Sequence, residues 1–227
     1  MTPAHPLQSL RAAATSDAGR PCVIWYGDEG RIELSAASLW NYAVKAANLF
    51  TQECDLPMGS PVRLQLPAHW QSVGLILGVW LAGAAVTYAD APALVVAHDG
   101  DADAMKADVI TSLDAWGRAS ENLSTATVLD IGRDLRAQSD VLIDLRPVDM
   151  NVTAVISARE PDTFTDLLAQ ASELPKTVGV VAQPQSHVLP TELPTIAAHV
   201  AAGGCVVICA EQMTDDVARQ EQVALWM

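Results

Sequence analysis

Two different periods of hydrophobic positions alternate along the chain. Over residues 61–66 every second side chain is apolar, which is the period of a strand with one buried face. Over residues 36–53 the apolar side chains instead recur at three- and four-residue spacing, which predicts an amphipathic helix. Ser35 stands where that helix needs an N-terminal cap, and Asn48 falls on its polar face.

The longest apolar stretch runs for fourteen residues, from Val73 to Val86, and contains only apolar residues and glycines. A membrane span needs about 20 largely apolar residues, whereas runs of about 10–14 are typical of buried helices. Gly74 and Gly78 also have the spacing at which membrane helices pair, but the run is too short and follows a strand-like segment and a proline. We therefore predict a helix buried inside the fold that ends near Gly83.

Strand and helix patterns alternate over most of the remaining chain. Residues 21–34 predict a hairpin around a Gly-Asp-Glu-Gly turn. Further strands are predicted at 84–90, 93–98, 125–131, 140–145, 152–157, 177–182 and 205–210, and further helices at 162–172, 192–202 and 215–226. This alternation is typical of an α/β fold with a largely parallel sheet. We expect a single domain over residues 1–227, with two subdomains at about 15–97 and 98–227 as the alternative.

Composition narrows the range of partners. The chain has 27 acidic and 13 basic residues, and its formal net charge is −14. Such a charge repels phosphate backbones and anionic lipid headgroups, so we expect neither nucleic acid nor a membrane surface as a partner. The first twenty residues lack the long apolar core of a secretory signal, and we therefore expect a cytoplasmic location.

Few residue patterns point to chemistry. Cys205 and Cys209 resemble a metal or redox pair, but in a strand they would lie roughly 13 Å apart, too far to share a bridge or an ion. The five histidines have no metal-ligand spacing, and no nucleophile elbow or dinucleotide-binding glycine motif is present. We therefore assign no catalytic residue, metal or cofactor from these patterns.

Three short segments nevertheless carry a family likeness. Leu34-Ser35-Ala36-Ala37, Met58-Gly59-Ser60-Pro61-Val62 and Gly83-Ala84-Ala85-Val86 follow one another in an order that resembles the N-terminal portion of the adenylate-forming superfamily of AMP-binding enzymes. That superfamily includes acyl-CoA synthetases and adenylation domains. Residues 177–210 are similar to a second block of the same family, and the likeness covers about 15–97 and 153–212. The chain also resembles small uncharacterised actinobacterial proteins related to AMP-binding enzymes.

The resemblance implies a phosphate-binding loop that this chain does not have. In the family, a loop rich in Ser, Thr and Gly ends in Pro-Lys-Gly and surrounds the ATP phosphates. The corresponding residues here are Ser157, Ala158, Arg159, Glu160, Pro161, Asp162 and Thr163. They include no glycine and no lysine, and their two acids oppose a triphosphate. The family's later magnesium and ribose motifs and its C-terminal lid domain also have no counterpart, so the resemblance implies a truncated, degenerate relative without adenylation activity.

Three residues remain as candidate substrate contacts. His187 matches the position at which family members place a histidine or aromatic residue against the substrate carboxylate, so it could contact a small acid. His69 and Trp70 begin the predicted buried helix, and Trp70 could stack on a planar ligand. For all three, packing or helix capping is the alternative interpretation.

The sequence leaves three hypotheses for the function of this protein. The chain is a non-catalytic binding or interaction module that keeps the fold. Alternatively, it is a ligand binder or enzyme that uses the old substrate pocket for an acyl, carboxylate or coenzyme A-type ligand. Thirdly, it is a structural subunit whose truncated edge is covered by a second copy or by another protein.

Overall fold

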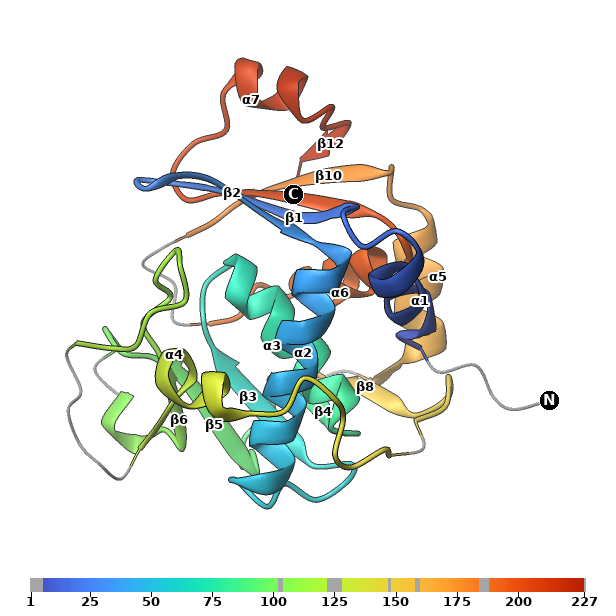
Figure 1. Ribbon diagram of the computed structural model, residues 1–227. Coiled ribbons are helices and arrows are strands. Elements are labelled where there is room, and N and C mark those ends of the chain that lie inside the picture. Colours follow the sequence, from blue (N-terminus) through green and yellow to red (C-terminus); the bar gives the residue numbers. More distant parts are fainter. Residues whose placement is uncertain are drawn as a thin grey trace.

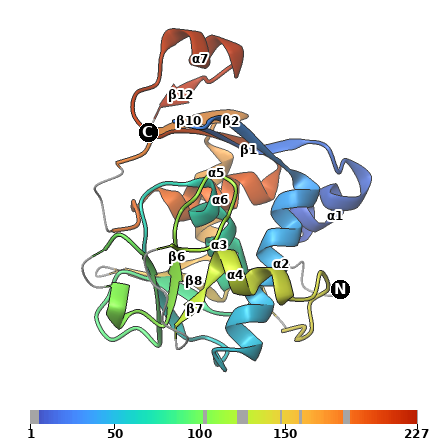
Figure 2. The same ribbon diagram turned by 60° about the vertical axis from the view of Figure 1, so that its left-hand side comes forward.

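Two mostly parallel β-sheets enclose a layer of helices (Figure 1). The computed structural model describes residues 6–101, 104–121, 128–146, 148–157, 160–183 and 188–226. Helices α2, α3 and α6 lie between the sheets, and α7 lies on the outer face of the smaller sheet (Figures 1 and 2). The predicted α/β class with largely parallel sheets is confirmed.

The smaller sheet has the strand order β12-β10-β11-β1-β2. It comprises β1 (Pro21–Gly27), β2 (Gly30–Ser35), β10 (Thr177–Val181), β11 (Cys205–Cys209) and β12 (Leu225–Trp226). Its pairs are parallel except β1–β2, which form the predicted hairpin. Gly30 has a φ of +97° in the hairpin turn, a conformation that favours glycine.

The larger sheet has the order β7-β6-β5-β3-β4-β8-β9, with only β9 antiparallel. Its strands are β3 (Pro61–Gln65), β4 (Ala85–Thr87), β5 (Leu94–His98), β6 (Val109–Thr111), β7 (Leu129–Asp130), β8 (Thr153–Ile156) and β9 (Asp162–Thr163). The chain passes from β3 to β4 on one side and then to β5 on the other. This reversal makes the carboxyl edge between β3 and β5 a switch point, where α/β sheets commonly bind ligands. Each sheet takes strands from both sides of residue 97, and the subdomain boundaries stay a prediction.

Seven α-helices connect these strands in the described chain. They are α1 (Gln8–Ser16), α2 (Ala36–Gln52), α3 (Trp70–Leu81), α4 (Ile131–Asp134), α5 (Phe164–Ser172), α6 (Leu193–Ala202) and α7 (Asp215–Gln220), with 3-10 turns η1 (Ala104–Lys106) and η2 (Leu135–Ala137). Ser35 caps α2 as predicted, because its side chain accepts from the N–H of Ser38.

The apolar run supplies α3 from Val73 to Leu81 and continues into β4, and every residue of α3 is buried. Helix α2 packs so closely on it that a Cβ added at Gly78 would lie 2.6 Å from the Cβ of Ala46. A helix enclosed on all sides needs no polar face, which explains the unbroken apolar sequence. Within the described residues, no helix has the length and apolar character that crossing a membrane requires.

Two predicted elements are wrong in part. Residues 140–145 form no strand, and their backbone is held instead by the buried side chain of Asn48, which was predicted to be on the exposed face of its helix. The predicted helix 215–226 stops at Gln220, and the chain turns back so that β12 can pair with β10. Trp226 packs over Gly179 there, so sheet pairing and packing end the helix early.

Candidate functional site

His69 is the first polar side chain after β3, at the switch-point edge. Its backbone is extended, and its Nδ1 accepts from the N–H of Gln71 at 3.2 Å, so the ring caps α3. The residue is 3% exposed, and burial lowers its pKa to about 3, with the neighbouring His98 acting in the same direction. The imidazole is therefore neutral at neutral pH, and because Nδ1 accepts a hydrogen bond, its proton belongs on Nε2.

The His69 ring packs against Trp25 of β1. Neither His69 Nε2 nor Trp25 Nε1 has a hydrogen-bond partner among the described residues, although both atoms are buried. The indole extends along its own strand to Gly27, where an added Cβ would lie 2.6 Å from Nε1. A glycine at 27 thus makes room for the Trp25 ring. The contact between the His69 and Trp25 rings depends on close packing and not on hydrogen bonds.

Gln71 connects α3 to the loop that follows β6. Its Oε1 accepts from the Thr111 hydroxyl at 2.7 Å, and its Nε2 donates to the carbonyl of Asp114 at 2.8 Å. Both partners are about forty residues away in the sequence, and Gln71 and Thr111 are buried. The loop after β6 is therefore held at the switch-point edge by the first turn of α3.

Trp70 is fixed beside this loop. Its Nε1 donates to the carbonyl of Ala115 at 3.1 Å, and its ring meets Tyr42 of α2 edge-on with centroids 5.2 Å apart. A cavity of about 320 Å³, here called the aromatic cavity, lies beside the two rings. It is lined by Tyr42, Lys45, Trp70, Trp116, Gly117, Ile131, Gly132, Leu135 and Arg136. Trp70, predicted as a stacking residue, thus lines a cavity of ligand size.

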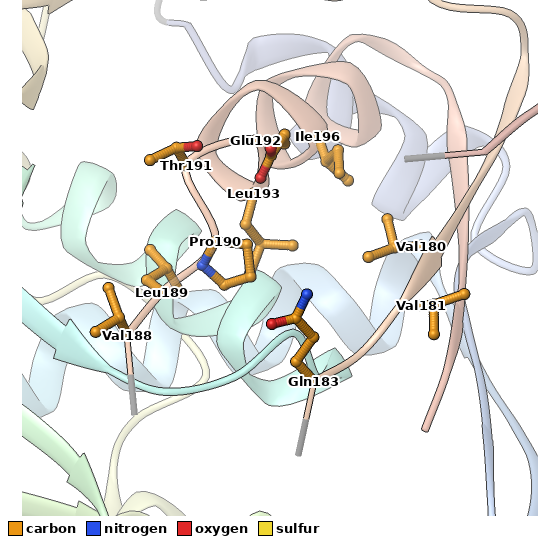
Figure 3. Close-up of a pocket in the computed structure, with 10 residues that line it drawn as sticks. All are labelled: Val180, Val181, Gln183, Val188, Leu189, Pro190, Thr191, Glu192, Leu193 and Ile196. Atoms are coloured by element: carbon orange, nitrogen blue, oxygen red, sulfur yellow. The ribbon is translucent and has the colours of Figure 1, made fainter. Parts of the chain in front are cut away.

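His187 lies outside the described residues, but the described residues on either side of it line two other cavities. Gln183 and Val188 belong to a cavity of about 370 Å³ beside β10 and α6. Figure 3 shows the Gln183 amide directed toward its centre, with Val180 on one side and Pro190 on the other. Val188 also lines a third cavity of about 270 Å³ at the carboxyl ends of β3 and β4, which includes Arg63, Gln65 and Tyr88. Neither of these two cavities is lined by Trp70.

The segment at the predicted phosphate-loop position follows β8 directly and ends with β9. Thr153 pairs with Thr163 and Val155 with Asp162, and the Ser157 hydroxyl donates to the carbonyl of Glu160 at 2.7 Å. Pro161 immediately precedes β9, and Ala158 and Arg159 are outside the described residues. The last two residues of the segment thus pair antiparallel with β8.

Helix α5 starts directly after this hairpin with its own acidic cap. The Thr163 hydroxyl accepts from the N–H of Asp166, and the Asp166 carboxylate accepts from the N–H of Thr163 at 2.9 Å. The hydroxyl of Thr163 also donates to this carboxylate, and these hydrogen bonds lower the pKa of Asp166. A side-chain anion already occupies the helix N-terminus, where a phosphate would otherwise be favoured.

Other reactive groups are dispersed. The part of the chain that is described has no group of three or more His, Cys, Asp or Glu side chains placed to hold a metal ion. Cys205 and Cys209 are free thiols at the two ends of β11, as the strand spacing predicts, and burial raises the pKa of each. Raised pKa values make both thiols poor nucleophiles at neutral pH.

Sequence reasoning missed Trp116 and Arg136 of the aromatic cavity. Trp116 is 63% exposed, and an exposed tryptophan beside a glycine in a polar segment was the available signal. Arg136 carried no sequence signal, because nothing in the pattern shows that it lies near Trp70.

Comparisons with known proteins agree with the predicted resemblance at the level of the fold. No family model matches this sequence. A TIGR03089 family protein of Mycobacterium tuberculosis (strain ATCC 25618 / H37Rv) is 35% identical over 136 residues, which are 54% of this chain and 56% of that protein.

Solved structures cover the chain more completely. An acyl-CoA synthetase from Brucella canis superposes with a TM-score of 0.67 and 14% identity, over 99% of this chain and 47% of that one. The N-terminal domain of FACL13 from Mycobacterium tuberculosis superposes with a TM-score of 0.64 and 15% identity, over 100% of this chain and 62% of that one. The chain therefore has the fold of such enzymes and spans about half the length of the relatives it matches.

Proposed function

We propose that this protein is a non-catalytic binding module built on the fold of adenylate-forming enzymes. The observation that carries the proposal is the acidic hairpin at residues 157–163, followed by the Thr163–Asp166 cap. The backbone N–H of Thr163 is already used by the Asp166 carboxylate, at the start of α5. A phosphate brought here would also meet Glu160, Asp162 and Asp166, and repulsion among such charges opposes binding.

Calorimetric titration with magnesium ATP tests this proposal, together with an assay for carboxylate-dependent exchange of pyrophosphate into ATP. We expect no saturable heat and no exchange. Saturable ATP binding would overturn the proposal if it weakens in Thr163→Val while the thermal midpoint of that variant stays at the parent value. The same titration with Asp166→Asn measures whether the cap carboxylate alone repels the nucleotide.

A second candidate function is binding of a small carboxylate at the cavity beside β3 and β4. Arg63 supports this candidate, because it lines the cavity. Its guanidinium donates to the carbonyl of Ala89 and pairs with the highly exposed Asp90, so part of its hydrogen-bonding capacity is left for a ligand. A carboxylate ligand can displace an exposed aspartate from an arginine. Octanoate is a suitable probe, and we expect Arg63→Gln to abolish its binding while Arg11→Gln, on the exposed side of α1, leaves it unchanged. Equal affinity in both variants would remove this candidate.

The predicted homo-oligomer or protein partner is the third candidate. Val141, Ile143 and Leu145 favour it, because these three apolar side chains are largely exposed within one short segment. Light scattering coupled to size exclusion measures the mass in solution, and a monomer at all concentrations would leave the two ligand-binding candidates.

A further inference from the structure

The aromatic cavity combines rigid rings with positive charge, in a protein whose formal net charge is −14. It opens between α2, the start of α3, the loop after β6, and the α4–η2 segment, which lies beside β6 and β7 (Figure 2). None of its lining residues belongs to the hairpin at 157–163 or to the two cavities near residue 188.

The inner wall of the aromatic cavity is preorganised. Trp70 is only 6% exposed, and its hydrogen bond to Ala115 and its edge contact with Tyr42 fix the ring plane. Gly117 faces the same ring and has a φ of +66°, so the turn here requires a glycine. A ligand ring that enters would therefore meet a wall that does not have to rearrange.

The rim of the cavity carries Trp116, which is largely in water. Its turn is rigid, because the Asp114 carboxylate accepts from the N–H groups of Trp116 and Arg118 and from the Arg118 guanidinium. Burial alone would raise the pKa of Asp114, but these hydrogen bonds lower it and keep the carboxylate charged. The loop thus holds the Trp116 indole at the rim, where its ring can contact a ligand in the cavity.

The charged groups that line the cavity are Lys45 and Arg136, both of them cationic. Lys45 donates to the carbonyl of Gln138 and pairs with Asp140, whose carboxylate points largely to solvent. Arg136 is exposed and makes no ion pair with any described residue. An anion is therefore attracted at this opening, although the rest of the surface repels it.

We propose that the aromatic cavity binds a planar aromatic carboxylate, with its ring between Trp70 and Trp116 and its carboxylate toward Arg136 and Lys45. A volume of about 320 Å³ accepts one or two fused rings. This site gives the binding module a ligand class. It is independent of the ATP test, because that test addresses the hairpin at residues 157–163.

Titration with 2-naphthoate, followed by calorimetry and by tryptophan fluorescence, tests the site on the full chain. Two matched probes accompany it: 2-naphthamide has the rings without the charge, and cyclohexanecarboxylate has the charge without the aromatic rings. We expect saturable binding and fluorescence quenching with 2-naphthoate, and binding at least about tenfold weaker for either matched probe.

Variants locate the binding. We expect Trp116→Ala and Arg136→Gln each to weaken 2-naphthoate binding about tenfold, with Trp116→Phe retaining part of the affinity. Arg133→Gln is the control, because Arg133 lies three residues before Arg136, in α4, but pairs with Asp134 and does not line the cavity. The three side chains that these variants change are exposed, so thermal midpoints should stay close to the parent value. Absence of saturable binding, equal binding of 2-naphthamide, or unchanged affinity in Trp116→Ala and Arg136→Gln would each overturn the proposal.

Discussion

The imidazole of His69 meets the indole of Trp25 edge to face, with ring centroids 4.3 Å apart and 68° between the ring planes. Trp25 belongs to the smaller sheet, and His69 follows a strand of the larger sheet. The two rings thus join the two sheets at the amino end of α3. Because the contact is buried, the lowered pKa of His69 keeps its ring neutral there.

Acid should therefore destabilise the fold through His69. The unfolded chain takes up a proton on this residue below its ordinary pKa of 6.5, whereas the folded ring stays neutral down to about 3. The unfolded state binds more protons within that window, so stability is lost as the pH falls from 6.5 toward 3. Between pH 7 and pH 5 we expect a loss of about 2 kcal/mol from this group.

Urea unfolding of the parent and of His69→Asn at both pH values measures that loss. Asparagine still caps a helix but does not titrate, so the variant should lose about 2 kcal/mol less than the parent. Identical pH dependence in the two proteins would show that His69 is protonated in the folded state.

Asn48→Ala should release the segment 138–143 from α2. The Asn48 amide donates to the carbonyls of Ser139 and Val141 and accepts from the N–H of Ile143, with all three distances between 2.9 and 3.0 Å. We expect a loss of about 2 kcal/mol in unfolding free energy and faster hydrogen exchange in this segment. Gln52→Ala, on the exposed side of the same helix, is the control and should change stability by less than about 0.5 kcal/mol. Equal behaviour of the two variants would mean that the segment is held by other contacts.

Gly78→Ala should crowd the contact between α2 and α3. The new Cβ would lie 2.6 Å from that of Ala46, and such overpacking costs about 1–3 kcal/mol, more than the gain of up to about 1 kcal/mol in helix propensity. We expect a net loss of about 1–2 kcal/mol in urea unfolding. In an Ala46→Gly background the same change should be neutral or stabilising, because the crowded methyl is gone. A loss of the same size in both backgrounds would place the strain elsewhere.

Glu221→Gln should loosen α7 from the smaller sheet. The Glu221 carboxylate accepts from the Tyr26 hydroxyl at 2.6 Å and from Arg31 Nε at 2.9 Å, and the hydrogen bond from Arg31 lowers its pKa. A neutral amide loses the ion pair, so we expect faster hydrogen exchange over residues 214–226 with little change elsewhere. Glu211→Gln, which is exposed, serves as the control. Unchanged exchange in Glu221→Gln would assign the docking of α7 to its apolar contacts alone.

Local patterns predicted those elements whose reasons are local. Ser35 was expected to cap α2, and its side chain accepts the N–H of Ser38. The hairpin at 21–34 and the strand at 205–210 were recognised from turn residues and from β-branched runs. Such signals act over a few residues, so they survive in the folded protein.

The misplaced elements depend on distant partners. The prediction of a polar face for α2 was wrong at Asn48. A segment about ninety residues later in the chain covers that position, and its backbone is hydrogen-bonded to the Asn48 amide. The strand predicted at 140–145 has an apolar run, Val141–Ile143, but within the described residues no strand pairs with it. β6 was not predicted, because Val109–Thr111 is too short to show a period.

The sequence by itself determined the α/β class, the buried character of α3 and the acidic, glycine-free segment at 157–163, because composition and period are properties of neighbouring residues. Only the tertiary structure decided that Trp70, Trp116 and Arg136 share one cavity. It also decided that the rings of Trp25 and His69 join the two sheets. These relationships depend on how long-range packing brings separate elements together, and no local period encodes that.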